Sequence, residues 1–178
     1  MLENITQDLS AFTKDGTFFS KAKCVLLSHT FHLVLIYRVG CALAKAYVIG
    51  GFLRVIVEYF IRIVYASDIS LKSRIGPGLM FVHGHDIVIG GDVKIGKRCK
   101  VYNGVTLGNK DVESPINQQP ILGDHVVIGS GAKLLGAIQI GDNVVIGANS
   151  VVLKNFPSNT VIAGVPAKII NQLDSNLK

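Results

Sequence analysis

The chain has 178 residues, of which 49% are hydrophobic and 17% are charged. This length predicts about one domain, and a charged fraction below the usual value of about 25% excludes an intrinsically disordered chain. Nineteen glycines, 7% aromatic residues and the absence of tryptophan indicate many tight corners rather than a large aromatic core. The net charge of +6 favours anionic partners. Nucleic acid is not expected, because the basic residues are dispersed and no aromatic platform accompanies them.

The three cysteines, Cys24, Cys41 and Cys99, are widely spaced. This spacing argues against a disulfide framework and is typical of proteins from a reducing compartment. The first residues, Met1 to Ser10, are polar and lack the pattern of a secretory signal. We therefore expect a cytoplasmic protein.

Residues 1–66 are predicted to form a small helical region. Apolar residues recur at helical spacing over residues 25–48, Gly50 and Gly51 end this run, and a second helix is expected up to residue 66. The longest stretch without a charge has 14 residues, whereas a bilayer span needs about 20. We therefore predict soluble helices that pack on each other or on another subunit. One helix face carries Arg54, Glu58 and Arg62, and this face could be solvated, paired, or laid on anionic lipid.

From Asp68 onwards, apolar residues recur every six positions, and glycine follows many of them. The anchors of this repeat are Ile69, Ile75, Phe81, Ile89, Ile95, Val101, Leu107, Leu122, Ile128, Leu134, Ile140, Ile146 and Val152. A two-residue phase shift separates Phe81 from Ile89. A period of six fits neither an amphipathic helix nor an alternating strand. It predicts a triangular solenoid in which three hexapeptides close a coil of about 18 residues, and the coils stack as parallel strands.

Residues 109–120 interrupt the repeat. They are polar, contain two prolines and lack the hexapeptide pattern, so they are predicted to leave the prism as a loop. Such a loop is often functional, and the alternative is a tolerated surface insertion. Residues 155–166, with their prolines and Gly164, should terminate the prism. We therefore expect three parts: a helical region over 1–66, a repeat domain over 67–168, and a tail over 169–178.

The repeat domain resembles the hexapeptide-repeat acyltransferases, and within them the serine acetyltransferase-like branch. The resemblance rests on residues 75–78 (IGPG), 83–84 (HG), 105–108 (VTLG), 128–133 (IGSGAK), 146–153 (IGANSVVL) and 163–168 (AGVPAK). Residues 31–32 (FH) and 37–40 (YRVG) extend it into the helical region. It implies a mainly β fold, a left-handed parallel β-helix. It also implies a homotrimer or a dimer of trimers, acetyl-CoA bound in a groove between neighbouring prisms, and acetyl transfer to a hydroxyl group.

A hydroxyl group needs a general base to attack a thioester, and histidine has a suitable pKa. His83 matches the family position of this base, and Asp68 matches the carboxylate that fixes the imidazole. Asp68 precedes His83 by 15 residues, nearly one coil, so the two side chains are expected to stack. The structural alternative for His83 is a corner residue. His85 is expected to line the acceptor pocket, with the role of true base as its alternative.

The resemblance places acetyl-CoA on the later coils and the C-terminal segment. By position, the candidate contacts are Ser130, Ala148, Lys154 and Lys168. Ala148 would offer backbone groups to the pantetheine arm, and the two lysines would meet phosphates. The alternative for each lysine is a solvated surface charge.

The candidate acceptor pocket departs from the serine acetyltransferases proper. Val82 stands where they have an acidic residue, and Gln118 and Gln119 stand where they have arginine and histidine. A zwitterion needs both charges, whereas glutamines suit neutral hydroxyls. We therefore expect a saccharide or small hydroxyl acceptor, as in capsular, colanic-acid or exopolysaccharide acetyltransferases, with a contact at the inner membrane surface as a further expectation. The alternative is serine acetylation.

A different class of protein is the other alternative. Hexapeptide prisms can be non-catalytic scaffolds, or can bind zinc through histidines on neighbouring coils. Within the repeat domain this would involve His83, His85 and His125. No metal is expected.

Overall fold

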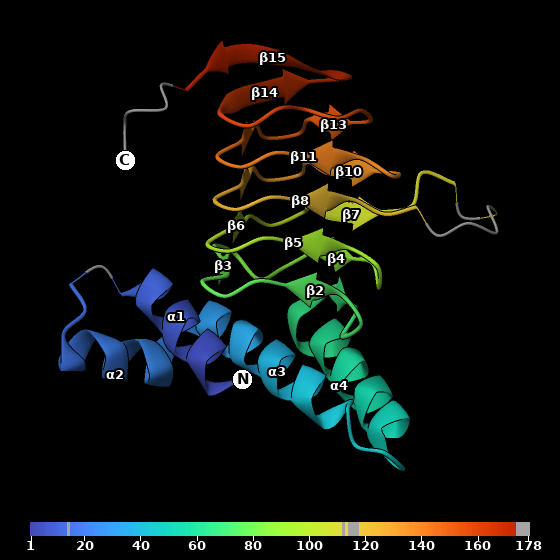
Figure 1. The fold of residues 1–178 in the computed structure, drawn as a ribbon. Helices are drawn as coiled ribbons and strands as arrows, with labels where there is room; N and C mark the ends of the chain where they lie inside the picture. The colour runs from blue at the N-terminus through green and yellow to red at the C-terminus, as the bar shows by residue number, and fades with distance from the viewer. Residues whose placement is uncertain (14, 112, 114–117, 174–178) are drawn as a thin grey trace.

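The computed structural model describes residues 1–13, 15–111, 113 and 118–173, and shows helices at one end of a stack of short strands (Figure 1). The helices are α1 (Leu2–Phe12), α2 (Phe18–Leu27), α3 (His29–Leu43) and α4 (Gly50–Tyr65). The strands form three sheets, and these are the three faces of a prism.

Each face collects strands from successive coils. The first face contains β1 (Asp68–Ile69), β4 (Val88–Ile89), β7 (Thr106–Gly108), β10 (Lys133–Leu135) and β13 (Val151–Val152). The second face contains β2 (Arg74–Ile75), β5 (Lys94–Ile95), β8 (Ile121–Leu122) and β11 (Gln139–Ile140). The third face contains β3 (Met80–Phe81), β6 (Lys100–Val101), β9 (Val127–Ile128), β12 (Val145–Ile146), β14 (Thr160–Gly164) and β15 (Ala167–Gln172).

All neighbouring strands are parallel except β14 and β15, which are antiparallel. The predicted left-handed parallel β-helix with a small N-terminal helical region is therefore confirmed.

The hexapeptide anchors form the core of the prism, as the period predicted. Phe81, Ile128 and Leu134 are fully buried, and every other anchor is at most 7% exposed. Residues four positions after an anchor are buried as well, among them Cys99 and Ser150. These two inward positions explain why the six-residue period could be recognised in the sequence.

The coils differ in length where the sequence period shifts. Asp68 pairs with Val88, an offset of 20 residues, whereas Val88 pairs with Thr106, an offset of 18. The two additional residues of the first coil lie between β3 and β4. Thr106 pairs with Lys133, an offset of 27, because the chain leaves the prism after β7 (Figure 1). Of this predicted loop, residues 112 and 114–117 lie outside the described residues.

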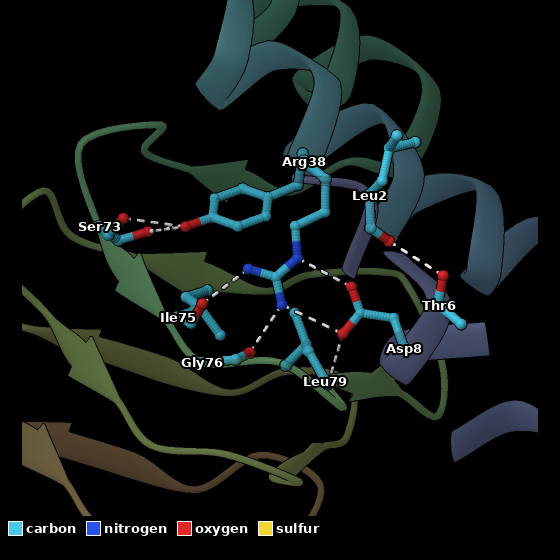
Figure 2. A network of polar contacts seen from close by, with 9 residues as sticks. Leu2, Thr6, Asp8, Arg38, Ser73, Ile75, Gly76 and Leu79 are labelled. Atoms are coloured by element: carbon cyan, nitrogen blue, oxygen red, sulfur yellow. Dashed lines mark hydrogen bonds and ion pairs between the residues drawn. The ribbon is translucent and has the colours of Figure 1, made fainter. Parts of the chain in front are cut away.

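A buried ion pair fastens the helices to the first coil (Figure 2). Arg38 on α3 donates from Nε to Asp8 Oδ2 at 2.8 Å, and both side chains are buried. The same guanidinium donates to the carbonyl oxygens of Ile75 and Gly76, each at 2.6 Å. Asp8 also accepts a hydrogen bond from the Leu79 amide at 2.9 Å. Arg38, which interrupts an apolar stretch in the sequence, is therefore a bridge between α1, α3 and the prism.

The polar residues of α4 face the prism rather than solvent. The Glu58 carboxylate accepts a hydrogen bond from the Leu71 amide at 2.8 Å, and Arg62 pairs with Asp68. The opposite side of α4 exposes apolar residues, including Phe52 (68% exposed) and Tyr59 (62%). Of the alternatives for the face of Arg54, Glu58 and Arg62, the structure shows the paired arrangement.

No single helix among the described residues is long and apolar enough to span a membrane. Taken together, α2 and α3 would meet the length and composition criteria, but they are bent by 79° relative to each other.

Beyond the last full coil, the chain reverses and adds β15 to the third face. This strand runs through residue 168, where the sequence analysis ends the repeat domain, because its backbone pairs with β14 as far as Gln172. Residues 174–178 of the predicted tail lie outside the described residues.

Candidate active site

His83 lies at the corner where the chain passes from β3 on the third face to β4 on the first. Its side chain is exposed, and the backbone around it is held from both sides. From below, the Ser67 hydroxyl donates to the Gly84 carbonyl at 3.2 Å and accepts a hydrogen bond from the Ile87 amide at 3.1 Å. From above, the Gly104 amide donates to the His85 carbonyl at 3.2 Å. The imidazole therefore projects from a backbone that has little freedom to move.

Gly84 is required at this corner because the helices approach it closely. A Cβ atom at Gly84 would lie 3.1 Å from Leu33 on α3 and 3.3 Å from Tyr65 on α4. Burial raises the pKa of Tyr65, and its hydroxyl donates to the His29 carbonyl at 3.1 Å. The helical region thus supports the corner that carries His83.

Asp68 lies at the start of β1, in the coil below His83. It forms an ion pair with Arg62 (Nη2 to Oδ2, 2.6 Å), and about half of each side chain is exposed. Within the described part of the chain, no hydrogen bond joins Asp68 to His83. This differs from the expected stacking, because the first coil has 20 residues and its register sets Val88 beside Asp68. His83 instead precedes the residues that stack on β1.

His85 is exposed two residues after His83. Its ring centre lies 6.0 Å from that of His29, which begins α3. His125 follows β8, at the corner between the second and third faces, so the three repeat-domain histidines do not share one corner. Among the described residues, no group of three or more His, Cys, Asp or Glu side chains is arranged to hold a metal ion.

The corner that carries His83 is repeated in the coils above it. We call this line of corners the His83 edge, and it comprises residues 82–87, 102–105, 129–132 and 147–150. Backbone hydrogen bonds join the successive corners: Gly131 N donates to the Asn103 carbonyl, and Asn149 N donates to the Ser130 carbonyl, both at 2.8 Å. Two of the candidate acetyl-CoA contacts, Ser130 and Ala148, therefore lie on the same edge as His83.

The two candidate lysines lie at different places. Lys168 is on β15 beside Ala163, and Ala163 stacks on Gly147, so Lys168 is close to the upper end of the His83 edge. Lys154 follows β13 on the corner between the first and second faces, and its Nζ lies 5.5 Å from the centre of the Phe156 ring. The structure therefore brings Lys168 towards the edge and leaves Lys154 on another one.

Gln118 and Gln119 precede β8, at the corner between the first and second faces. Gln118 is exposed, whereas the Gln119 side chain lies over Gly90 and accepts a hydrogen bond from the Asp92 amide at 3.0 Å. Within one chain these glutamines and His83 flank opposite borders of the first face.

Three residues near His83 were not expected from the sequence. Tyr102 packs edge to face with His83, with ring centres 6.3 Å apart. Its position could have been found from the phase shift, because Phe81 pairs with Val101 and the next residues stack as well. Ser67 and Arg62 have no such signal, because their contacts depend on the turn between α4 and β1.

Two sequence families match the prism. Residues 119–154 match the family described as bacterial transferase hexapeptide (six repeats), and residues 86–112 match the hexapeptide repeat of succinyl-transferase. These matches agree with the period of six and with the three faces.

Similar proteins cover the helices as well. A serine acetyltransferase of Helicobacter pylori (strain J99 / ATCC 700824) is 38% identical over 171 residues, which cover 96% of this chain and 95% of that protein. A serine acetyltransferase of Synechococcus elongatus is 41% identical over 115 residues, and this match spans only 47% of that protein. The crystal structure of serine acetyltransferase in complex with coenzyme A from Brucella abortus strain S19 superimposes with a TM-score of 0.85 at 31% identity, covering 97% of this chain and 68% of that one.

Proposed function

Since the chain belongs to the serine acetyltransferase family of hexapeptide-repeat acyltransferases, we propose that it transfers the acetyl group of acetyl-CoA to the side-chain hydroxyl of serine. The observation that carries this proposal is the likeness to the Helicobacter pylori serine acetyltransferase over 95% of that protein's length. This favours serine, which the sequence analysis held as the alternative, over the saccharide that it preferred.

In the proposed reaction, the His83 imidazole accepts the proton of the serine hydroxyl as the oxygen attacks the thioester carbonyl carbon. The C–O bond forms, the C–S bond breaks, and the imidazolium returns the proton to the departing CoA sulfur. The fixed backbone of the corner and the ring of Tyr102 hold the imidazole, because both contact it from the prism itself. Asp68 would then stabilise the imidazolium after release from Arg62.

The proposed acetyl-CoA path follows the His83 edge. It is supported by the positions of Ser130 and Ala148 above His83, and Lys168 would meet a phosphate at its upper end. Lys154 is a weaker candidate for the same path, because it lies on a different corner and already stacks on Phe156. The reaction needs no metal in this proposal.

The proposed active site is completed between copies of the chain. His83 and the glutamines at residues 118–119 border the first face on opposite sides, so a neighbouring prism could bring one protomer's glutamines to another's His83. A homotrimer or a dimer of trimers would provide this arrangement. The exposed apolar side of α4 supports association through the helical region.

A saccharide hydroxyl is the second candidate acceptor. Val82 and Gln118 provide no charge, although serine carries both an ammonium and a carboxylate group. An inner-membrane location would accompany this alternative. The two candidates differ in their products, so acetyl-CoA should be incubated with the full chain and either L-serine or a panel of oligosaccharides. Mass spectrometry should detect O-acetylserine. An acetylated oligosaccharide without O-acetylserine would instead establish the second candidate.

A further inference from the structure

A cleft of about 810 Å³ separates the α3–α4 pair from the second face of the prism. Its floor includes Gly76 and Gly96, and its far wall includes Gly51 at the start of α4. Six basic side chains line it, and no acidic side chain belongs to its described lining. These residues, which define the basic cleft, are Arg38, Lys45, Arg54, Lys72, Arg74 and Lys94.

Internal ion pairs account for only two of these charges. Asp8 neutralises Arg38, and Glu58 lies 3.9 Å from Arg54, whose Nε atom is buried without a hydrogen-bond partner. The four remaining cations form no ion pair with any described residue. They are Lys45, Lys72, Arg74 and Lys94.

Two of the unpaired cations are direct neighbours. Arg74 on β2 and Lys94 on β5 are register partners in a parallel ladder, and both side chains point outwards from the second face. Like charges at neighbouring positions of a sheet repel each other and destabilise it. Lys72 adds a third positive charge to the same wall. An anion between these side chains would convert the repulsion into attraction.

We infer that the basic cleft is a binding site for a phosphate-bearing ligand, separate from the proposed active site. Its volume is within the range of about 300–1,000 Å³ that is usual for small-molecule sites. Arginine and lysine are the side chains that bind phosphoryl groups, and four unpaired cations suit a ligand with at least two negative charges. His83 belongs to the corner between the third and first faces, whereas the cleft opens on the second face.

The ligand's phosphate can come from a soluble molecule or from a lipid headgroup, and two probes distinguish these sources. Pyrophosphate is titrated into the full chain in a calorimeter at low salt. Separately, the chain is sedimented with vesicles of phosphatidylglycerol or of phosphatidylcholine. Pyrophosphate binding indicates a soluble ligand, and sedimentation with phosphatidylglycerol alone indicates a headgroup.

The test variant is Arg74→Gln combined with Lys94→Gln, and the matched control is Lys97→Gln combined with Lys100→Gln, which removes two exposed charges outside the cleft. We expect the test variant to lose at least about tenfold in affinity for the bound probe and the control to change by less than about twofold. Without ligand, the test variant should unfold at the same urea concentration as the unmodified chain or a higher one, since repulsion has been removed.

Gly51→Leu tests the cleft by volume instead of charge. A Cβ atom at Gly51 would have no neighbour within 4 Å, so the larger side chain fills the cleft without a clash. We expect it to weaken binding at least about threefold. The inference is overturned if the unmodified chain binds neither probe, or if the Arg74→Gln/Lys94→Gln variant binds as tightly as the unmodified chain.

Discussion

Arg38 Nε lies 2.8 Å from Asp8 Oδ2 at a place where the two side chains are only 6% and 0% exposed. The pair also bonds to the backbone of the first coil on both sides, through Ile75, Gly76 and Leu79. The ion pair therefore links two helices to the start of the prism, below the corner that carries His83.

Replacing Asp8 by asparagine should leave the buried Arg38 charge without compensation. Removal of one partner of a buried pair costs about 3–5 kcal/mol. We expect the free energy of unfolding in urea to fall by this amount. Lys97→Met, an exposed change, should stay within about 0.5 kcal/mol. A loss below about 1 kcal/mol for Asp8→Asn would show that the pair does not secure the helices.

Gly131 is required by its backbone at the His83 edge. Its φ is +73°, and a Cβ atom would lie too close to the Asn149 side chain. Gly131→Ala should cost about 1–2 kcal/mol of stability because of the left-handed conformation. It should also raise the KM for acetyl-CoA, since Ser130 is adjacent. Gly108→Ala, where nothing lies within 4 Å of a Cβ atom, is the control. An unchanged KM would remove Ser130 from the proposed acetyl-CoA path.

Cys99 should make stability depend on pH in the alkaline range. Burial raises the pKa of this thiol from 9.0 to about 11. The folded chain therefore keeps a proton that the unfolded chain loses, so the contribution is fully present below pH 9 and is lost as the pH rises towards 11. Between these values the free energy of unfolding should fall by about 1.4 kcal/mol per pH unit from this group.

The comparison is between the unmodified chain and Cys99→Ala, in urea unfolding at several values of pH. The absolute stability of the variant will differ because a core side chain is truncated, so the quantity compared is the slope with pH. Equal slopes for the two chains above pH 9 would show that Cys99 does not bind its proton more tightly in the fold.

The prism could be predicted because its signal is repeated. Each anchor, such as Ile128 or Leu134, faces the same axis at the same interval, so one local rule is written many times in the chain. The tie between Asp8 and Arg38 is a single contact across 30 residues. No periodicity announces it, and Arg38 looked only like a charge that interrupts an apolar helix.

The candidate site could be predicted in part. The positions of His83, Ser130 and Ala148 follow from the period, and the structure sets them on one edge. The partner of Asp68 could not be predicted, because Ala66 adopts a left-handed conformation (φ +46°) that turns β1 back towards Arg62 on α4.

Asp68→Asn separates a catalytic from a structural role of this carboxylate. Because the ion pair with Arg62 is about half exposed, its loss should change stability by less than about 1 kcal/mol. If Asp68 stabilises the His83 imidazolium, kcat should fall at least about tenfold and the lower limb of the pH–rate profile should shift. Arg62→Met is the matched variant, since it removes the other partner and leaves the carboxylate in place. Equal losses of kcat in both variants would assign Asp68 a structural role.

The steady-state rate of CoA release with L-serine, measured for the unmodified chain and for His83→Ala, tests the central claim most directly. His83 is exposed, so its removal should leave the fold intact, and His125→Ala serves as the control for loss of an exposed histidine. We predict serine-dependent CoA release by the unmodified chain and by His125→Ala, and a kcat lowered by about 10²–10⁴ in His83→Ala. Undiminished release by His83→Ala, or release by the unmodified chain that does not depend on serine, would contradict the account.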